Sequence, residues 1–144
     1  MPRLDAERIA QWRRFSILST RLQREIDREL TEEEALPLAW YDVLTELRNA
    51  GGEARVHELC EVLDDVPSSL SRRLARMEDE GLLERQPTPR EGDRRAVTVS
   101  ITPAGRSIWR DANVRYRWLV QQYFAQHLTE TDLMALQRVW GKLG

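Results

Sequence analysis

The sequence predicts a mainly α-helical domain with one small β-hairpin. Apolar residues recur every three or four positions over most of its 144 residues, which is the period of an amphipathic helix. A two-residue alternation of apolar and polar side chains is found between residues 82 and 101, where strands are expected. Glycine (7 residues) and proline (6 residues) are sparse, which argues against a loop-rich all-β protein. A chain of this length is expected to form one domain.

The first half of the chain is predicted to form three helices. Residues 5–30 carry apolar side chains at three- and four-residue steps, and the acidic run at 31–34 is expected to end this helix. Pro37 stands where the first turn of a second helix tolerates proline, and the glycines at 51–52 are expected to end that helix. A short third helix is predicted over residues 54–63.

A fourth helix and two strands are predicted next. Ser68 and Ser69 are favourable N-caps for a helix that stops at Gly81. Residues 82–86 and 96–101 are the predicted strands, and the polar segment between them holds two prolines, one glycine and three arginines. Two helices joined by a short turn form a helix-turn-helix, and a β-hairpin directly after it describes a winged helix.

The C-terminal third of the chain returns to a helical period. Thr102 caps and Pro103 begins a helix that is expected to reach about Gln126. Thr129 and Asp132 resemble a capping box, with Asp in place of the usual Glu or Gln. A last helix with one apolar face is therefore predicted at the end of the chain.

Long apolar faces lie on the predicted helices at both ends of the chain. These segments, residues 1–36 and 103–144, carry four of the five tryptophans, whereas residues 37–102 can close a small core of their own. Helices with so much apolar surface need a partner. We therefore expect both ends to pack together and against a second copy as a two-fold dimer. The alternative is that they close one larger monomeric core.

Charge is distributed unevenly along the chain. The formal net charge is only −2, which by itself argues against a nucleic-acid partner. Residues 25–65 hold thirteen acidic residues and three arginines, whereas residues 85–117 hold eight arginines and three acidic residues. All cationic residues except Lys142 are arginine, the side chain best suited to forked contacts with phosphate and guanine. A GC-rich genome explains the ratio of Arg to Lys as well, but not the clustering.

The composition excludes several classes of protein. Cys60 is the only cysteine, so neither an internal disulfide nor a cysteine-rich zinc site is expected, and a reducing cytoplasm suits the chain. Cys60 and His57 could form a thiolate–imidazole pair, but a buried, inert cysteine is the preferred interpretation. No apolar run approaches the roughly 18 residues of a membrane span. Because no phosphate loop, metal-ligand set or catalytic trio stands out, we expect neither an enzyme nor a cofactor.

Four segments of the predicted winged helix carry recognisable patterns. Residues 93–105 read Asp-x-Arg, then an alternating strand, then Thr-x-x-Gly. This segment resembles the wing of the MarR (multiple antibiotic resistance regulator) family of bacterial transcription factors. Residues 40–44 resemble the second helix of that family, residues 66–72 its recognition helix, and residues 78–85 its helix-to-wing junction. The resemblance implies a homodimer whose winged helices occupy successive major grooves of a near-palindromic operator in double-stranded DNA. It also implies a repressor that, as in many members, a small aromatic or phenolic effector releases from DNA.

The predicted recognition helix presents short hydroxyls and arginines in its first turns. Ser68, Ser69 and Ser71 can contact bases or phosphates, although each serine can equally serve as a plain cap. Arg72 is long enough to donate to the O6 and N7 atoms of guanine, and Arg76, one turn further on, is a candidate for a phosphate contact. The N-terminus of the helix adds partial positive charge that favours phosphate.

Arginines at the predicted hairpin tip are the strongest candidates for DNA binding. Arg94 and Arg95 stand beside Asp93, and one of them can enter the minor groove, although the sequence does not decide which. By the resemblance, Arg95 is the arginine of the Asp-x-Arg pattern, and Arg90 is a weaker member of the same tip; the alternative is that these charges are merely solvated. Arg73 falls where family members usually carry an apolar residue, and it is either a phosphate contact or a solvated charge.

The aromatic residues of the terminal helices are compatible with a ligand pocket or with a dimer core. Trp12, Phe15 and Trp109 could line a pocket for an aromatic effector, with Arg106 facing a ligand carboxylate. The same residues at the same helical spacing would serve equally well as core, which is the preferred interpretation. The main alternative function is a winged-helix module that binds protein and has lost DNA binding.

Overall fold

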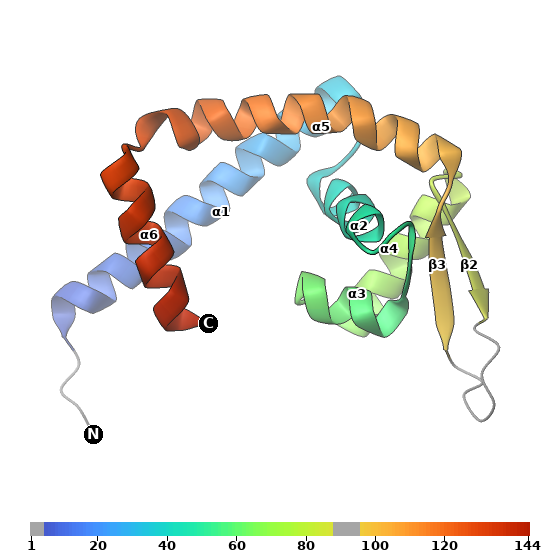
Figure 1. The fold of residues 1–144 in the computed structure, drawn as a ribbon, viewed down its shortest axis with the longest axis horizontal. Helices are drawn as coiled ribbons and strands as arrows, with labels where there is room; N and C mark the ends of the chain where they lie inside the picture. Colours follow the sequence, from blue (N-terminus) through green and yellow to red (C-terminus); the bar gives the residue numbers. More distant parts are fainter. Residues whose placement is uncertain (1–4, 88–95) are drawn as a thin grey trace.

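The structure, a computed structural model, describes residues 5–87 and 96–144 and is mainly helical (Figure 1). The predicted fold class, a helical chain with a small sheet, is confirmed. In chain order the elements are α1 (Ala6–Glu34), α2 (Leu38–Asn49), β1 (Glu53–Arg55), α3 (Val56–Leu63), α4 (Pro67–Asp79), β2 (Leu83–Pro87), β3 (Val97–Ile101), α5 (Pro103–Tyr123), the 3-10 helix η1 (Ala125–His127) and α6 (Glu130–Leu143).

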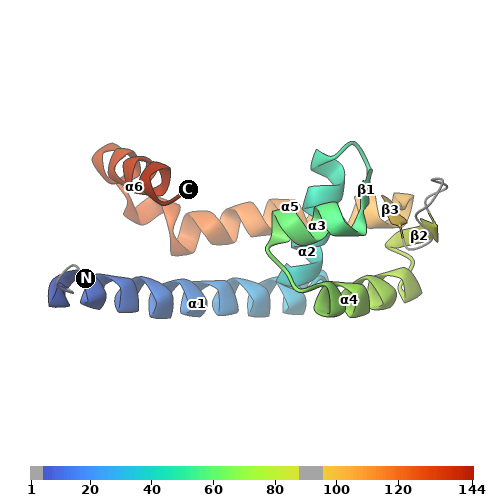
Figure 2. The same cartoon turned by 90° about the horizontal axis from the view of Figure 1, so that it is seen from below.

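The described chain consists of two long helices and a compact lobe. α1 and α5 lie side by side, whereas α2, α3, α4 and the sheet gather at one end of the molecule (Figures 1 and 2). α6 turns back at the other end, where the ring centroid of Trp140 lies 5.6 Å from that of Phe15 on α1. The elements of the lobe lie within residues 37–102.

An apolar core holds the lobe together, and it continues into buried residues of α1 and α5. α4 buries Leu70, Leu74 and Met77, which recur at the three- and four-residue steps of one helical face. α2 adds Leu44 and Leu47 to the same cluster. Complete burial of such a side chain contributes about 1.5–3 kcal/mol, so this face fixes how α4 sits on the lobe.

The three strands form an antiparallel sheet in the order β1-β3-β2. Ala54 of β1 pairs with Val99, and Leu83 of β2 pairs with Ile101, which places β3 in the centre. β1 corrects the sequence prediction, which assigned its residues to the third helix; α3 begins only at Val56. A three-residue strand is too short to show an alternating pattern, and only its pairing with β3 defines it.

The turn from the sheet into α5 explains the Thr-x-x-Gly pattern. The hydroxyl of Thr102 donates to the carbonyl oxygen of Gly81 (2.6 Å) and accepts from the backbone N–H of Gly105 (3.0 Å). It therefore caps α5 and ties that helix to the end of α4. A Cβ at Gly105 would collide with the carbonyl oxygen of Leu82, so only glycine fits this close approach.

The first helix is longer than predicted. α1 continues through the acidic run and ends at Glu34. Two of the acidic side chains have cationic partners, because Glu32 lies 3.3 Å from Arg28 and Glu33 pairs with Arg115 of α5. The carboxylates that predicted a break are therefore compensated in the helix.

The start of α4 also differs from the prediction. The N-cap is Val66, which offers no side-chain cap, and Pro67 takes the first helical position. Ser68 and Ser69 lie inside the first turn, so they are not the caps that the sequence suggested. α5 ends at Tyr123, earlier than predicted, and a 3-10 turn follows it.

Other predicted helix ends are confirmed. The Thr129 hydroxyl accepts from the N–H of Asp132 (3.2 Å), and the Asp132 carboxylate accepts from the N–H of Thr129 (2.9 Å), which completes the capping box. Gly51 and Gly52 have φ values of 86° and 108°, the left-handed region that favours glycine after a helix. Pro37, which was predicted for the first turn of α2, is instead its N-cap, one position earlier.

Candidate nucleic-acid interface

The exposed face of α4 carries the five residues that the sequence predicts for this helix. Leu70, Leu74 and Met77 point into the core, so the opposite face of the helix is turned outward. All five predicted contacts are exposed: Ser68, Ser69, Ser71, Arg72 and Arg76. The packing of α4 therefore presents hydroxyl groups and guanidinium groups together on one surface.

A hollow of about 320 Å³ separates the exposed face of α4 from the first turn of α2. Trp40 of α2 forms one wall. The α4 residues around it follow helical spacing, and they are Ser69, Arg72, Arg73 and Arg76. We call this feature the Trp40 hollow. Three guanidinium groups at one hollow make it a place of positive potential.

Arg73 is not a freely solvated charge, because it forms an ion pair. Its guanidinium lies 2.7 Å from the carboxylate of Asp65, and only 21% and 18% of the two side chains are exposed. The carboxylate of Asp65 also accepts from the backbone N–H of Val66 at 2.8 Å, at the start of α4. On α2, burial raises the pKa of the Asp42 carboxyl, and the positive charge of Arg73 partly opposes that shift.

A second ion pair joins the end of α4 to the wing. The carboxylate of Glu78 accepts from the backbone N–H of Arg85 on β2 (2.9 Å) and from its guanidinium at 3.3 Å and 3.2 Å. The backbone hydrogen bond, followed by the guanidinium, lowers the pKa of Glu78. This contact fixes the orientation of β2 relative to the exposed face of α4.

Comparison with known proteins bears on this geometry. Residues 36–96 match a sequence model of the MarR family. A MarR family transcriptional regulator from Streptomyces coelicolor, solved in complex with DNA, is 26% identical and superposes with a TM-score of 0.89 over 99% of this chain and 89% of that one. Residues 36–96 of this chain, and its fold as a whole, are similar to those of MarR family regulators. No protein of curated function matches its sequence.

Two further solved structures match almost the whole chain. A mutant MarR from E. coli, complexed with operator DNA, is 26% identical, with a TM-score of 0.81 over 97% of this chain and 99% of that one. An organohalide-sensing transcriptional regulator, solved in its 2,4-dichlorophenol-bound form, is 23% identical, with a TM-score of 0.81 over 97% of this chain and 80% of that one. This last likeness is one of fold alone.

The structure describes the wing along its two paired strands, β2 and β3. The ladder between β2 and β3 runs from Leu83, opposite Ile101, to Pro87, opposite Val97. The predicted minor-groove residues lie beyond that last pair and outside the described residues, and they are Arg90, Arg94 and Arg95. Their role remains a prediction.

Trp109 packs between α5 and α2 of the lobe. Its indole N–H donates to the hydroxyl of Thr45 (2.9 Å), and its ring is stacked on that of Tyr41, with an interplanar angle of 5° and centroids 6.1 Å apart. The guanidinium of Arg48 covers the ring at 3.6 Å from the centroid. Trp109 therefore joins a terminal helix to the helix-turn-helix.

The other residues predicted for an effector pocket lie in different surroundings. Trp12 and Phe15 contact each other with ring centroids 6.2 Å apart, and Phe15 also contacts Trp140 of α6. Arg106 is exposed, and its guanidinium lies against Gly52. None of the described ring contacts joins the pair on α1 to Trp109, so within one chain the predicted pocket residues form separate groups.

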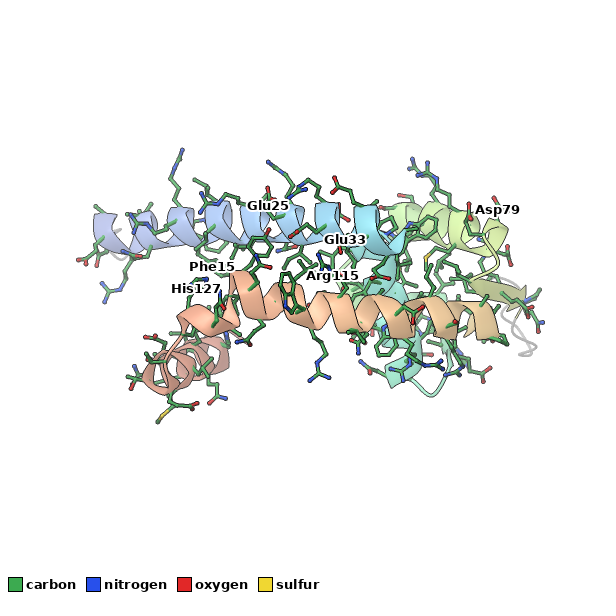
Figure 3. All side chains as sticks on the ribbon, turned by 90° about the horizontal axis from the view of Figure 1, so that it is seen from above. Phe15, Glu25, Glu33, Asp79, Arg115 and His127 are labelled. Carbon is green, nitrogen blue, oxygen red and sulfur yellow. The ribbon has the colours of Figure 1, made fainter. Side chains whose placement is uncertain are left out.

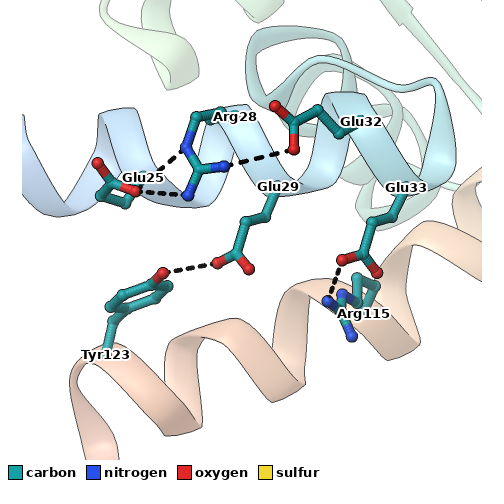
Figure 4. Close-up of polar contacts among 7 residues, drawn as sticks. All are labelled: Glu25, Arg28, Glu29, Glu32, Glu33, Arg115 and Tyr123. Atoms are coloured by element: carbon teal, nitrogen blue, oxygen red, sulfur yellow. Dashed lines mark hydrogen bonds and ion pairs between the residues drawn. The ribbon is translucent and has the colours of Figure 1, made fainter.

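Polar side-chain contacts join α1 to α5 (Figures 3 and 4). The hydroxyl of Tyr123 donates to Glu29 (2.7 Å), and this hydrogen bond raises the pKa of Tyr123. Glu33 pairs with Arg115, and the two side chains face each other between the helices. At these two positions the acidic stretch of the sequence is used to hold the terminal helices together.

Cys60 is half-buried, less than the buried position that the sequence predicts, and it packs against the lobe core. His57, its predicted alternative partner, is exposed. Within residues 5–87 and 96–144, no group of three or more His, Cys, Asp or Glu could hold a metal ion. No described helix is both long and apolar enough to cross a membrane.

Two residues of this surface were not found from the sequence as site residues. Trp40 was identified only as part of a family pattern, and Asp65 only as part of a tight turn. The contact between Asp65 and Arg73 crosses the turn of the helix-turn-helix, so helical spacing gives no signal for it. Only the packing of α4 on α2 brings Trp40 beside the arginines.

Proposed function

We propose that this chain is a sequence-specific, DNA-binding transcriptional regulator that acts as a homodimer in the cytoplasm and represses its targets. The observation that carries the proposal is the outward face of α4, which combines three serines and two arginines on a helix fixed by a buried leucine face. Likeness over almost the whole chain to a regulator solved with DNA supports the same assignment. The proposed role is that of a regulator and not of an enzyme.

The proposed DNA contacts fall into two groups. Ser68, Ser71 and Arg72 enter the major groove, where Arg72 can donate a forked pair of hydrogen bonds to guanine. The N-terminus of α4 directs partial positive charge at the DNA backbone. The wing places its tip in the neighbouring minor groove, and its candidate residues are Arg90, Arg94 and Arg95.

Exposed apolar side chains on the terminal helices support the proposed homodimer. Val114 of α5 is 71% exposed, and Leu143 of α6 is 76% exposed. An apolar surface of this extent is unfavourable in water unless a partner covers it. A two-fold partner would use the same surface on both chains and would present two copies of α4 to a near-palindromic operator. The residues that would be covered include Ile9, Trp12, Phe15, Ile17, Leu18, Val114, Trp118, Phe124, Leu133, Met134, Val139, Trp140 and Leu143.

We further propose that a small aromatic or phenolic ligand releases the protein from DNA. A similar fold has been solved with 2,4-dichlorophenol bound, which supports this class of ligand. The candidate contacts are Trp109 and Arg106 near the lobe, and Trp12 and Phe15 on α1. A ligand that displaces the ring of Trp109 from Tyr41 would move α5 relative to α2. Quenching or a spectral shift of tryptophan fluorescence on titration with phenols, together with loss of DNA binding, would support this mechanism.

The experiment that tests the proposed function is fluorescence anisotropy of a labelled duplex from the upstream intergenic region, with a scrambled duplex as the control, at two salt concentrations. A protein that neutralises several phosphates loses affinity steeply with salt, and a specific one prefers the upstream duplex. Arg72→Ala should reduce that preference as well as the affinity. An equal loss on both duplexes would make Arg72 a phosphate contact instead.

The formal net charge of −2 favours a second candidate function, a winged-helix module that binds protein. Such a module would show no duplex binding at either salt concentration, and the exposed face of α4 would then have to contact a protein surface. Selection of bound genomic fragments separates this alternative from a regulator whose operator lies elsewhere.

A further inference from the structure

The Trp40 hollow is built from two elements that α4 packing brings together. Ser69, Arg72 and Arg76 stand at positions i, i+3 and i+7 of α4, and Arg73 stands between them. Trp40 closes the opposite side from the first turn of α2. The hollow therefore has an aromatic wall, a hydroxyl group and three guanidinium groups.

The charges around this hollow favour an anion. Arg72 and Arg76 are exposed, and no hydrogen bond or ion pair joins either of them to another residue in the described part of the chain. Arg73 is paired with one carboxylate, that of Asp65. Guanidinium groups without carboxylate partners bind phosphate well, because their planar donors match the geometry of its oxygens.

Asp65 restricts the orientation of Arg73. Its carboxylate forms an ion pair with Arg73 and accepts a hydrogen bond from the backbone N–H of Val66, so it is tied to the start of α4. A guanidinium has five N–H donors, and the contact with Asp65 leaves others available for a ligand. A cation that is already held in place loses less side-chain freedom when it binds.

We propose that the Trp40 hollow is a pre-organised seat for one backbone phosphate of DNA, in which Asp65 is a positioning residue that orients Arg73 toward that phosphate. Arg73 and Arg76 donate to the phosphate oxygens, Trp40 forms the wall of the seat, and Arg72 at its edge stays available for the major groove. The inference rests on the proposed function and adds to it a specific anion site, together with an acidic residue that promotes DNA binding.

The proposed role of Asp65 predicts a change in DNA affinity opposite to the change expected from net charge alone. Removing a negative charge from a DNA-binding surface ordinarily strengthens binding to a polyanion. We expect Asp65→Asn to weaken binding at least threefold, equally on upstream and scrambled duplexes, and to flatten the salt dependence of the affinity. Asparagine keeps an oxygen that can accept from Val66, so the substitution is directed at the ion pair.

Asp64→Asn is the matched control, because it makes the same charge change one residue earlier. Asp64 is exposed and forms no ion pair with another described residue. It has a φ of 50°, a left-handed conformation that asparagine adopts readily. We expect this variant to bind DNA as tightly as the unsubstituted protein, or more tightly. Thermal unfolding of both variants checks that the lobe remains folded.

Two further variants keep the test decisive if Asp65→Asn disturbs folding. Arg73→Lys retains the positive charge but lacks the planar fork, and it should also weaken binding at least threefold. Trp40→Leu should weaken binding on both duplexes while leaving the preference between them unchanged. Unchanged or tighter binding by Asp65→Asn, or full affinity of a folded Arg73→Lys, overturns the proposal while the proposed function stands. If the unsubstituted protein binds no duplex, both fail together.

Discussion

The lobe formed by residues 37–102 and the terminal helices differ in where they place their apolar side chains. In the lobe, Leu44, Leu70 and Leu74 are completely buried. Among the described residues, every exposed large apolar side chain except Val62 and Val66 lies on α1, α5, α6 or the segment just after α5. The lobe closes its core within one chain, whereas the terminal helices have apolar surface that one chain does not cover.

Selected arginines of the two regions also differ in whether a carboxylate lies beside them. On the terminal helices, Arg28 pairs with Glu25 at 2.9 Å, and Arg115 pairs with Glu33 (Figure 4). On α4, Arg72 and Arg76 have no carboxylate partner among the described residues. Glu33 therefore compensates an arginine where α1 and α5 pack together, whereas Arg72 and Arg76, on the surface proposed to meet DNA, have no such partner. This difference suits separate tasks, DNA binding for the lobe and dimerisation for the terminal helices, and single substitutions can distinguish the two.

The largest expected effect is on the folding of the lobe. Leu74→Ala removes a completely buried side chain and leaves a cavity, which should lower the free energy of unfolding by about 2–5 kcal/mol. Val62→Ala, at an exposed position of the same lobe, should change it by less than about 0.5 kcal/mol. Urea denaturation followed by circular dichroism, at one fixed protein concentration, measures both values. Equal losses would mean that the lobe does not close its own core.

The second effect is on assembly. Val114→Glu places a charge on the exposed apolar face of α5 and should convert a dimer to monomers, because the charge would have to be buried at the interface. Loss of the second winged helix should lower DNA affinity by about a hundredfold. Light scattering after size exclusion measures the mass. Val62→Glu, the same change in the lobe, should leave the mass unchanged; a monomeric unsubstituted protein would contradict the division of tasks.

The third effect concerns the wing. The double variant Arg94→Ala with Arg95→Ala should weaken DNA binding at least tenfold, about 1.4 kcal/mol, while the dimer remains intact. Arg110→Ala with Arg117→Ala removes the same charge from exposed positions of α5 and should have a smaller effect. Anisotropy titrations compare the two variants. If both lose affinity equally, only the total charge matters and the wing has no specific role.

The smallest effect is a pH dependence at the junction of α4 and the wing. The pKa of Glu78 is lowered in the folded protein, so its ionised form stabilises the fold above the pKa of the unfolded chain, and this stabilisation is lost as the pH falls through the folded value. Glu78→Gln should therefore cost less than about 1 kcal/mol near neutral pH and nothing in acid. Melting temperatures at several pH values test this expectation. A difference that grows on acidification would contradict it.

Much of the fold was predictable because its signals are local. The buried face of α4, the capping box at Thr129 and the glycines after α2 all follow from spacing within a few residues. The Thr-x-x-Gly pattern was found in the sequence, but its reason was not. Gly105 is required by the carbonyl oxygen of Leu82, and that contact is visible only in the folded chain.

The features that the sequence did not reveal depend on contacts between distant residues. α1 extends to Glu34 while Glu33 is paired with Arg115, which is 82 positions away. β1 exists because Ala54 pairs with Val99. On the candidate site, the exposed residues of α4 were predictable from helical spacing, whereas the pairing of Arg73 with Asp65 and the wall formed by Trp40 were not, because both cross from one element to another.

The central claim is that the lobe binds DNA and that a second copy of the chain covers the exposed apolar faces of the terminal helices. The most direct test is the number of chains bound to one upstream duplex, measured by sedimentation of a labelled duplex at concentrations well above the dissociation constant. We expect two chains per duplex, and a duplex cut to one half-site should bind far more weakly. One chain per upstream duplex with full affinity, or equal binding to the upstream and half-site duplexes, would contradict the claim.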